Sequence, residues 1–297
     1  MRENQRARRP EGSTETGRVA VASESSTLSP FHRRYRPAPL QGYTPSLAAV
    51  LVLLPPSEGK AVGVDGPVLD FAELAFPALN RTRRSLVREL VQLAKREPAA
   101  LQKALGLSDR QRHELDRNAL LLRAPTLPAS ELYTGIVYDN LSYSTLTGAG
   151  LTRAQESLVV ASSLFGLLRP EDRVPSYRLS GGTTLPGLGG LAPIWRPVLE
   201  KELAKQDFVV DLRSGAYVNL ARLPGGVQVR VLRDEGGLRT VVSHDNKWTK
   251  GKLARALCLH GASSVDEVAQ VARDVCDAVV VDGNRIDLLL YGLASAR

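Results

Sequence analysis

The order of apolar and polar residues predicts that ordered structure begins near Ala48. Residues 49–54 (AVLVLL) form a continuous apolar run that is too short for a helix and is followed at once by two prolines. Such a run is typical of a strand buried on both faces of a sheet. Further strands are predicted at LVVAS (158–162) and FVVDLRS (208–214). We therefore expect a central sheet in which residues 49–54 form a middle strand.

Leucines at helical spacing predict a helix that begins at Pro77 and ends before Pro98. The leucines from position 79 to position 93 mark its apolar side. The intervening arginines, which include Arg83, are expected on the outer side of this helix.

Two further helices are predicted directly after it, at 99–105 and from a capping pattern at Ser108 onward. They are joined by a turn at Gly106 and resemble a helix-hairpin-helix. In that motif the glycine turn approaches a nucleic-acid phosphate, and here Arg110 and Arg112 lie just beyond the turn. The same turn is common between helices that bind nothing, so both interpretations stay open.

The C-terminal half alternates helices with hairpins. A helix is predicted around 194–206, a hairpin on both sides of Gly236-Gly237, a basic helix over 244–257 and a closing hairpin at 282–284. This order is irregular and does not repeat a strand–helix–strand unit. We therefore predict an α+β (mixed α/β) single domain over 48–297, with a central mixed sheet, flanking helices and the helix-hairpin-helix-like element.

Residues 1–47 are expected to form a disordered extension rich in Arg, Ser and Pro. They show no periodic apolar pattern, so they bury too little surface to offset the entropy of ordering. Residues 1–45 contain eight arginines and four glutamates, and their surplus of four positive charges is half of the net charge of +8. A solvated extension or a wrongly assigned start codon is favoured over a dedicated nucleic-acid arm.

Composition excludes several classes of protein. The chain is 43% hydrophobic and 24% charged, and no apolar run approaches the roughly 18 residues of a membrane span. The arginine-rich start also lacks the apolar stretch of a secretory signal. Two cysteines and four histidines make no disulfide framework and no zinc-like spacing. We expect a cytoplasmic protein without a membrane partner, a metal or a cofactor.

Candidate ligand groups follow the first strand. Ser57, Glu58 and Lys60 leave its C-terminal end on a loop, where a rigid sheet tends to present binding groups. The alternative is that Ser57 caps a turn and that Lys60 is solvated.

A second set of candidates lies in the middle of the chain and in the basic helix. Some of them belong to ELYTGIVYDNL (131–141), which we expect to form a helix. Arginine forks bind phosphate or carboxylate, and tyrosines offer faces for stacking, so the set suits a nucleotide or a nucleic-acid backbone. The alternative is that these groups hold long loops in place, and both alternatives predict that they converge. The candidates are Tyr133, Tyr138, Asp139, Arg169, Tyr177, Arg178, Lys247, Lys250 and Arg255.

These motifs together resemble the YaaA family of bacterial peroxide stress proteins. The matching blocks are the first strand into PPSEGK, YTGIVYDNL, LFGLLRPEDRVPSYRL, LRSGAY and the basic helix, in the family's order over about residues 50–291. The resemblance implies a cytoplasmic oxidative-stress protein with an unusual α/β fold, a helix-hairpin-helix and a basic cleft that binds DNA. It also implies a role in limiting damage from intracellular iron and peroxide.

The resemblance carries individual positions with it and also shows departures. Many members have an acidic residue and a methionine where this chain has Ser180 and Gly181, and an acidic residue where it has Ala216. The positions that match are Lys60, Tyr133, Gly135, Tyr138, Asp139, Gly166, Arg169, Pro170, Tyr177, Arg178, Ser243, Lys247, Gly251 and Arg255.

Two classes of function stay open at this point. The first is a monomeric protein that binds double-stranded DNA through phosphates without sequence preference. The second is an enzyme that acts on a nucleotide or nucleobase in a basic, tyrosine-lined cleft. The segment 180–190 is rich in glycine but lacks the Lys-Ser/Thr ending of a phosphate loop, and no catalytic residue is assigned. An adaptor without a ligand ranks third.

Overall fold

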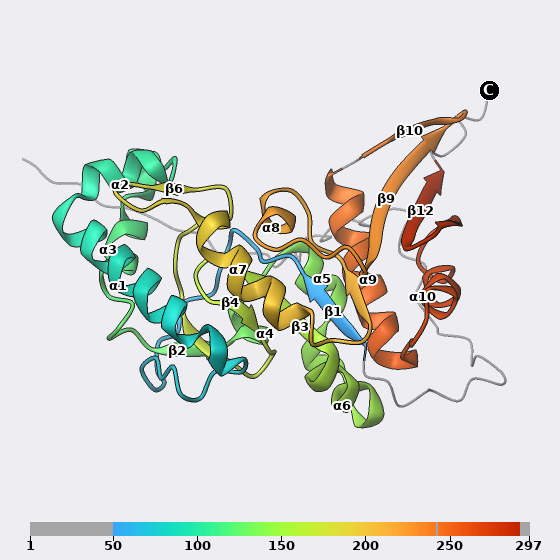
Figure 1. The fold of residues 1–297 in the computed structure, drawn as a ribbon, viewed down its shortest axis with the longest axis horizontal. Helices are drawn as coiled ribbons and strands as arrows, with labels where there is room; N and C mark the ends of the chain where they lie inside the picture. The colour runs from blue at the N-terminus through green and yellow to red at the C-terminus, as the bar shows by residue number, and fades with distance from the viewer. Residues whose placement is uncertain (1–49, 242, 292–297) are drawn as a thin grey trace, which may run out of the picture. The chain divides into compact units, whose positions relative to one another are not determined.

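The strand predicted at 49–54 lies inside a mixed eight-stranded sheet (Figure 1). The computed structural model describes residues 50–241 and 243–291, so the extension predicted at 1–47 lies outside the described residues. The strand order is β11-β12-β9-β8-β1-β3-β4, and β10 pairs with β9. The strands are β1 (Leu51–Leu54), β3 (Leu158–Ser162), β4 (Gly166–Leu168), β8 (Val209–Asp211), β9 (Val227–Glu235), β10 (Leu238–Thr240), β11 (Ala278–Asp282) and β12 (Arg285–Tyr291).

The centre of the sheet is parallel and buried. β1 pairs in parallel with β3 on one side and with β8 on the other, in the registers Val52–Leu158 and Leu51–Val209. All residues of these three strands are buried, as their continuous apolar sequences predict. β4 and β11 run antiparallel to their neighbours at the two ends of the strand order. The predicted mixed sheet is confirmed.

Helices cover the sheet and one another. α6 contacts β1 and β3, α9 contacts β9, and α10 contacts β11 and β12, while α5 and α6 pack on α9. α1, α2 and α3 pack together as a separate group (Figure 1). The helices are α1 (Asn80–Arg96), α2 (Pro98–Ala104), α3 (His113–Ala119), α4 (Ala129–Leu132), α5 (Ile136–Leu141), α6 (Gly148–Ser157), α7 (Leu191–Leu203), α8 (Ala216–Asn219), α9 (Ser243–His260) and α10 (Val265–Ala272).

Short ladders and 3-10 turns complete the described chain. β2 (Thr126–Pro128) pairs with β5 (Arg173–Pro175), and β6 (Thr184–Leu185) pairs with β7 (Gly189–Gly190). A 3-10 turn at Pro77–Leu79 leads into α1. The hairpin predicted around Gly236-Gly237 is present as β9 and β10.

The two helices predicted on either side of Gly106 are present as α2 and α3. That glycine has φ +63°, which a residue with a side chain rarely adopts. A 3-10 turn (Asp109–Gln111) precedes α3, and the Gln111 side-chain oxygen accepts from the Ser108 N–H and hydroxyl. The role of this element as a phosphate-binding helix-hairpin-helix stays a prediction.

Arg83 of α1 differs from the expectation that it would lie on the outer side of the helix. Its side chain is completely buried. The guanidinium donates to the carbonyls of Phe165 and Leu167 at 2.8 and 2.6 Å, and also to that of Ala75. Burial lowers the pKa of Arg83 to about 10. This arginine therefore stabilises the contact between α1 and the strand β4, which periodicity alone does not indicate.

The crossing of α5 and α9 generates a stability prediction. A Cβ atom at Gly251 would lie 2.3 Å from the Val137 carbonyl oxygen and 2.8 Å from the Asn140 Cβ. We expect Gly251→Ala to lower the free energy of unfolding by about 1–3 kcal/mol, because backbone must move to admit a methyl group. Gly225→Ala is the matched control, since nothing lies within 4 Å of its Cβ position. Urea unfolding curves of equal midpoint for the two variants would contradict this prediction.

Candidate functional site

The candidate site lies where parallel strands end. β1 continues along the chain toward β3, whereas β8 continues toward β9 on the other side. The loops after β1 and β8 therefore diverge, and such a switch point is where α/β sheets commonly bind ligands. Six residues meet here, and together we call them the Lys60 site: Glu58, Lys60, Tyr133, Ser162, Tyr177 and Arg178.

The Lys60 amine lies against two tyrosine rings. Its nitrogen is 4.3 Å from the ring centre of Tyr177 and 5.6 Å from that of Tyr133, and it donates to the Ser57 carbonyl at 2.9 Å. Burial lowers the pKa of Lys60 to about 8, and nearby Arg178 adds to this effect while Glu58 opposes it. A substantial neutral fraction of this amine is therefore present near neutral pH.

A break in the predicted helix over 131–141 positions Tyr133. The structure has two short helices, α4 and α5, separated at Tyr133–Gly135, so the expectation of one continuous helix was wrong. Tyr133 is extended and forms an isolated antiparallel bridge with Lys60, and Gly135 follows it with φ +92°. The glycine permits the break, and the backbone pairing fixes the phenol beside the amine.

Three hydroxyl groups form a buried chain under the amine. The Ser162 hydroxyl oxygen is 2.7 Å from the Tyr177 oxygen, which is 3.0 Å from the Tyr133 oxygen. Ser162 accepts from the backbone N–H groups of Leu164 and Phe165, so its own proton is directed to Tyr177. In the bond between Tyr177 and Tyr133 either phenol can donate, and Tyr133 lies at the end of the chain. Burial raises the pKa of both tyrosines and keeps them protonated.

Two further tyrosines border this chain. Tyr138 stacks on Tyr133 with ring centres 5.6 Å apart and donates to the Pro55 carbonyl at 2.8 Å. Tyr217 lies against Gly181, and its pKa is raised by burial and by nearby Tyr177 and Glu58. Tyr217 was not among the candidates from sequence, although its block LRSGAY was recognised. The available signal was that Tyr217 is the last residue of this matched block.

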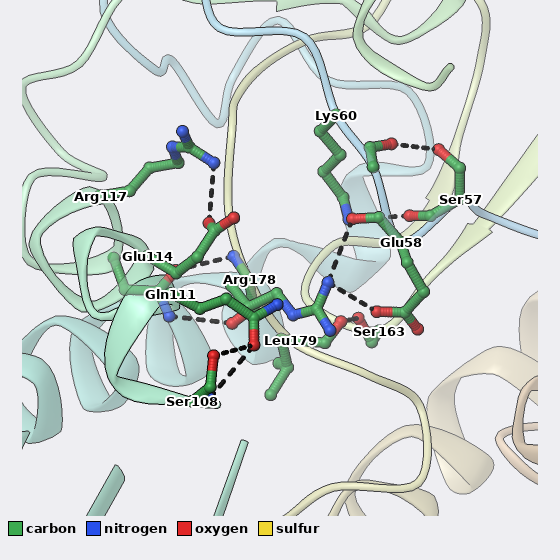
Figure 2. A network of polar contacts seen from close by, with 12 residues as sticks. Ser57, Glu58, Lys60, Ser108, Gln111, Glu114, Arg117, Ser163, Arg178 and Leu179 are labelled. Carbon is green, nitrogen blue, oxygen red and sulfur yellow. Dashed lines mark hydrogen bonds and ion pairs between the residues drawn. The ribbon is translucent and has the colours of Figure 1, made fainter. Parts of the chain in front are cut away.

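Charged side chains form the mouth of the site (Figure 2). The Arg178 guanidinium lies 3.0 Å from the Glu58 carboxylate, and the side chain of Glu58 is 55% exposed. On α3, Glu114 and Arg117 form a 2.7 Å ion pair that lies across from them. The charges of both α3 residues act on Lys60.

Asn118 attaches α3 to this mouth. Its side-chain amide donates to the Arg178 carbonyl at 2.8 Å and accepts from the Arg178 N–H at 2.9 Å. Asn118 is completely buried. Glu114, Arg117 and Asn118 were missed from sequence, because only the folded chain brings α3 to the loop that carries Arg178.

A lysine of α9, Lys250, is buried against the loop that follows β8. The Lys250 amine donates to the Arg213 carbonyl at 3.2 Å, and the Arg213 guanidinium forms two 2.8 Å hydrogen bonds with the Asp211 carboxylate. Burial lowers the pKa of Lys250 to about 8, and the Asp211 charge opposes this shift. Arg213 and Asp211 were also missed from sequence as partners of the basic helix.

The remaining candidates lie in other surroundings. Ser57 donates to the Gly59 carbonyl and accepts from the Thr134 N–H, which ties the Lys60 loop to the break before α5. Arg169 donates to the Glu156 carbonyl, and Arg255 donates to two carbonyls at the end of α5. Lys247 is exposed on α9. Ligand binding by these four residues stays a prediction.

Asp139 borders a separate pocket of about 600 Å³. The pocket lies beside the stacked Tyr133 and Tyr138, and its other polar lining is mostly hydroxyl and carboxylate groups. These include Ser130, Glu131, Thr134, Ser142, Tyr143, Ser144, Thr145 and Glu171. Tyr143 donates to the Glu171 carboxylate at 2.6 Å. The lining is acidic, so this pocket suits a group that donates hydrogen bonds and not a phosphate.

Metal and thiol chemistry have little support within the described residues. They contain no group of three or more His, Cys, Asp and Glu side chains placed to hold a metal ion. Burial raises the pKa of Cys258 and of Cys276 to about 12, so almost no thiolate is available to react with peroxide near pH 7. No helix in the described part of the chain is long and apolar enough to cross a membrane.

The low pKa of Lys60 can be measured directly. Competitive acetylation followed by mass spectrometry reports the neutral fraction of each lysine as pH rises. We expect Lys60 to reach half of its maximal reactivity near pH 8. Lys201, an exposed residue of α7, is the control. The same midpoint for both lysines would contradict the buried, aromatic surroundings described for Lys60.

Comparison with known proteins finds relatives over most of the chain. The family described as Peroxide stress protein YaaA matches residues 50–275. A UPF0246 protein of Corynebacterium efficiens is 42% identical over 248 residues, covering 81% of this chain and 98% of the relative. A UPF0246 protein of Streptomyces coelicolor is 42% identical over 236 residues, covering 76% of this chain and 90% of the relative. The chain therefore belongs to the YaaA family of peroxide stress proteins.

Proposed function

We propose that this protein acts in peroxide stress by binding double-stranded DNA through phosphates, and that this binding limits peroxide- and iron-dependent damage. The observation that carries the proposal is a set of four arginines at and beside α3, namely Arg110, Arg112, Arg117 and Arg178, the last of which is held to α3 by Asn118. We further propose that it works as a monomer in the cytoplasm without a cofactor.

Unpaired arginines mark the outer end of this set. Arg110 and Arg112 are exposed just before α3, and within the described ranges neither guanidinium has an ion-pair partner. An exposed, unpaired guanidinium is available for a phosphate at little cost in desolvation. The inner end is formed by Arg117 and Arg178, which form ion pairs with Glu114 and Glu58 respectively. The Asn118 bonds to Arg178 keep the two ends in a fixed relation.

The chemistry of these groups predicts binding that is independent of sequence. Guanidinium contacts to phosphates position a protein on a duplex but do not read bases. Each neutralised phosphate releases counterions, so the affinity should fall steeply as salt rises. A net charge of +8 also favours association with a polyanion.

The first test removes the two unpaired arginines. Arg110→Ala/Arg112→Ala should weaken binding of a 20-base-pair duplex and lower the slope of log affinity against log salt by about 2, one for each lost phosphate contact. Lys201→Ala/Arg273→Ala is the matched control, because it removes the same charge from exposed residues on α7 and after α10. Fluorescence anisotropy at several salt concentrations measures both effects. Equal losses in the two double variants, or affinity independent of salt, would refute the proposal.

A second candidate function is supported by the pocket beside Asp139. Its volume of about 600 Å³ accommodates a nucleoside, Tyr133 and Tyr138 border it, and its carboxylates can accept from the amino groups of a base. An enzyme acting on a nucleotide or nucleobase would bind the base in this pocket, with any phosphate outside it and with Asp139 as the group that orients or deprotonates the substrate.

The variant Asp139→Asn separates the two functions. Its side chain is exposed, so the exchange should leave thermal unfolding unchanged. If the protein acts chiefly by binding DNA, the variant should retain both DNA affinity and protection of cells against hydrogen peroxide. A folded variant that binds DNA normally but no longer protects cells would reverse the ranking and favour the enzyme.

A further inference from the structure

We propose that Lys60 is a nucleophilic amine that condenses reversibly with the aldehyde of a phosphorylated sugar. Two sources share this chemistry, an abasic deoxyribose within DNA and a free sugar phosphate. The DNA source rests on the proposed function, whereas the free sugar phosphate does not.

The surroundings of Lys60 hold the amine in place with one hydrogen bond and no ion pair among the described residues. Among the described residues its one hydrogen-bond acceptor is the Ser57 carbonyl, at 2.9 Å. The faces of Tyr177 and Tyr133 lie beside it and accept no strong hydrogen bond. In the described part of the chain no carboxylate forms an ion pair with the amine, and the two nearby carboxylates pair elsewhere, Glu58 with Arg178 and Glu114 with Arg117. Two of the three N–H groups of the ammonium therefore donate no hydrogen bond within the described residues.

Burial activates the amine for attack on a carbonyl. With a pKa of about 8, about one tenth of Lys60 is neutral at pH 7. An ordinary exposed lysine has roughly one neutral molecule in two thousand at that pH. Desolvation and the charges of Arg178 and Arg117 favour the neutral form, whereas Glu58 and Glu114 oppose it. The two tyrosines that face the amine stay uncharged, because burial raises their pKa values.

The hydroxyl chain supplies the proton that the reaction needs. The Lys60 nitrogen attacks the aldehyde carbon and forms a C–N bond, and the carbonyl oxygen takes up a proton. The carbinolamine then loses that oxygen together with a nitrogen-bound proton as water and leaves an imine, without any oxidation or reduction. The hydroxyl chain ends at Tyr133, and either phenol can donate in the Tyr133–Tyr177 bond. We assign Tyr133, the end of this chain and the backbone partner of Lys60, as the group that protonates the oxygen and takes the proton back from the nitrogen.

The mouth of the site selects a sugar that carries phosphate. Glu58 is the exposed partner of the less exposed Arg178, with 55% and 23% of the two side chains accessible. A phosphate can displace the Glu58 carboxylate and take both N–H groups of the guanidinium fork. The Arg178 guanidinium also donates to the Glu58 carbonyl, and its charge acts on the Lys60 amine, so a phosphate bound there would keep its sugar near the nitrogen.

Reductive trapping tests the proposal. The full chain is incubated with sodium cyanoborohydride and one of three probes: a duplex with one abasic site, the same duplex without it, or deoxyribose 5-phosphate. Peptide mass spectrometry then locates any adduct. The protein carries no substitution in this experiment, so the result does not depend on whether a variant folds. We expect an adduct on Lys60 with an aldehyde probe and none with the intact duplex.

Variants define the roles of the two groups. Lys60→Arg should lower the yield of trapped product at least tenfold, whereas Lys201→Arg should leave it unchanged. Tyr133→Phe should slow trapping at least tenfold but retain the Lys60 adduct, since it removes the proton donor and not the amine. Adducts spread over exposed lysines, or no adduct with either aldehyde probe, would overturn the proposal.

The outcomes also separate this proposal from DNA binding. Trapping of deoxyribose 5-phosphate by a protein that shows no salt-dependent DNA affinity would support the amine and refute the proposed function. Salt-dependent DNA affinity without any trapping would do the reverse. Trapping of the abasic duplex at Lys60, with little trapping of the free sugar phosphate, would support both and identify DNA as the source.

Discussion

The parallel pairing of β1 with both β3 and β8 is the constraint on which the site depends. Three strands buried on both faces end at one edge, so the loops that follow them present their polar groups together. Ser162 ends β3 and Lys60 follows β1, while Asp211 ends β8 and its partner Arg213 follows that strand. The rest of the fold adds side chains to this edge, with α3, the break before α5 and α9 each contributing one or more.

Lys250 is buried and Lys60 is half-buried at this edge, and both have a cost in free energy. Desolvation lowers the pKa of Lys60 and Lys250 alike, so folding disfavours the charged form of each amine. The cost of Lys60 is offset in part by the two tyrosine faces and the Ser57 carbonyl. A protein selected for stability alone would place an apolar side chain there. The persistence of an amine among tyrosines is therefore better explained by function than by packing.

Much of the fold was predictable because its signals are local. The apolar runs of β1, β3 and β8 and the glycine turn between β9 and β10 each depend on a few adjacent residues. The site was only partly predictable, since its contacts join distant segments. Lys60 was recognised as a loop residue, but its pairing with Tyr133 and the Asn118 bonds to Arg178 require the folded chain. Arg83 shows the same limit, because periodicity cannot distinguish a buried arginine from an exposed one.

The central claim is that DNA phosphates and a sugar meet at the Lys60 site. The most direct measurement is a crystal structure with a short duplex that carries one stable abasic analogue. This account predicts a phosphate on Arg178, the analogue turned out of the helix within hydrogen-bond reach of the Lys60 amine, and Glu58 displaced. A duplex bound on another surface, with Glu58 still paired to Arg178 and Lys60 covered, would contradict it.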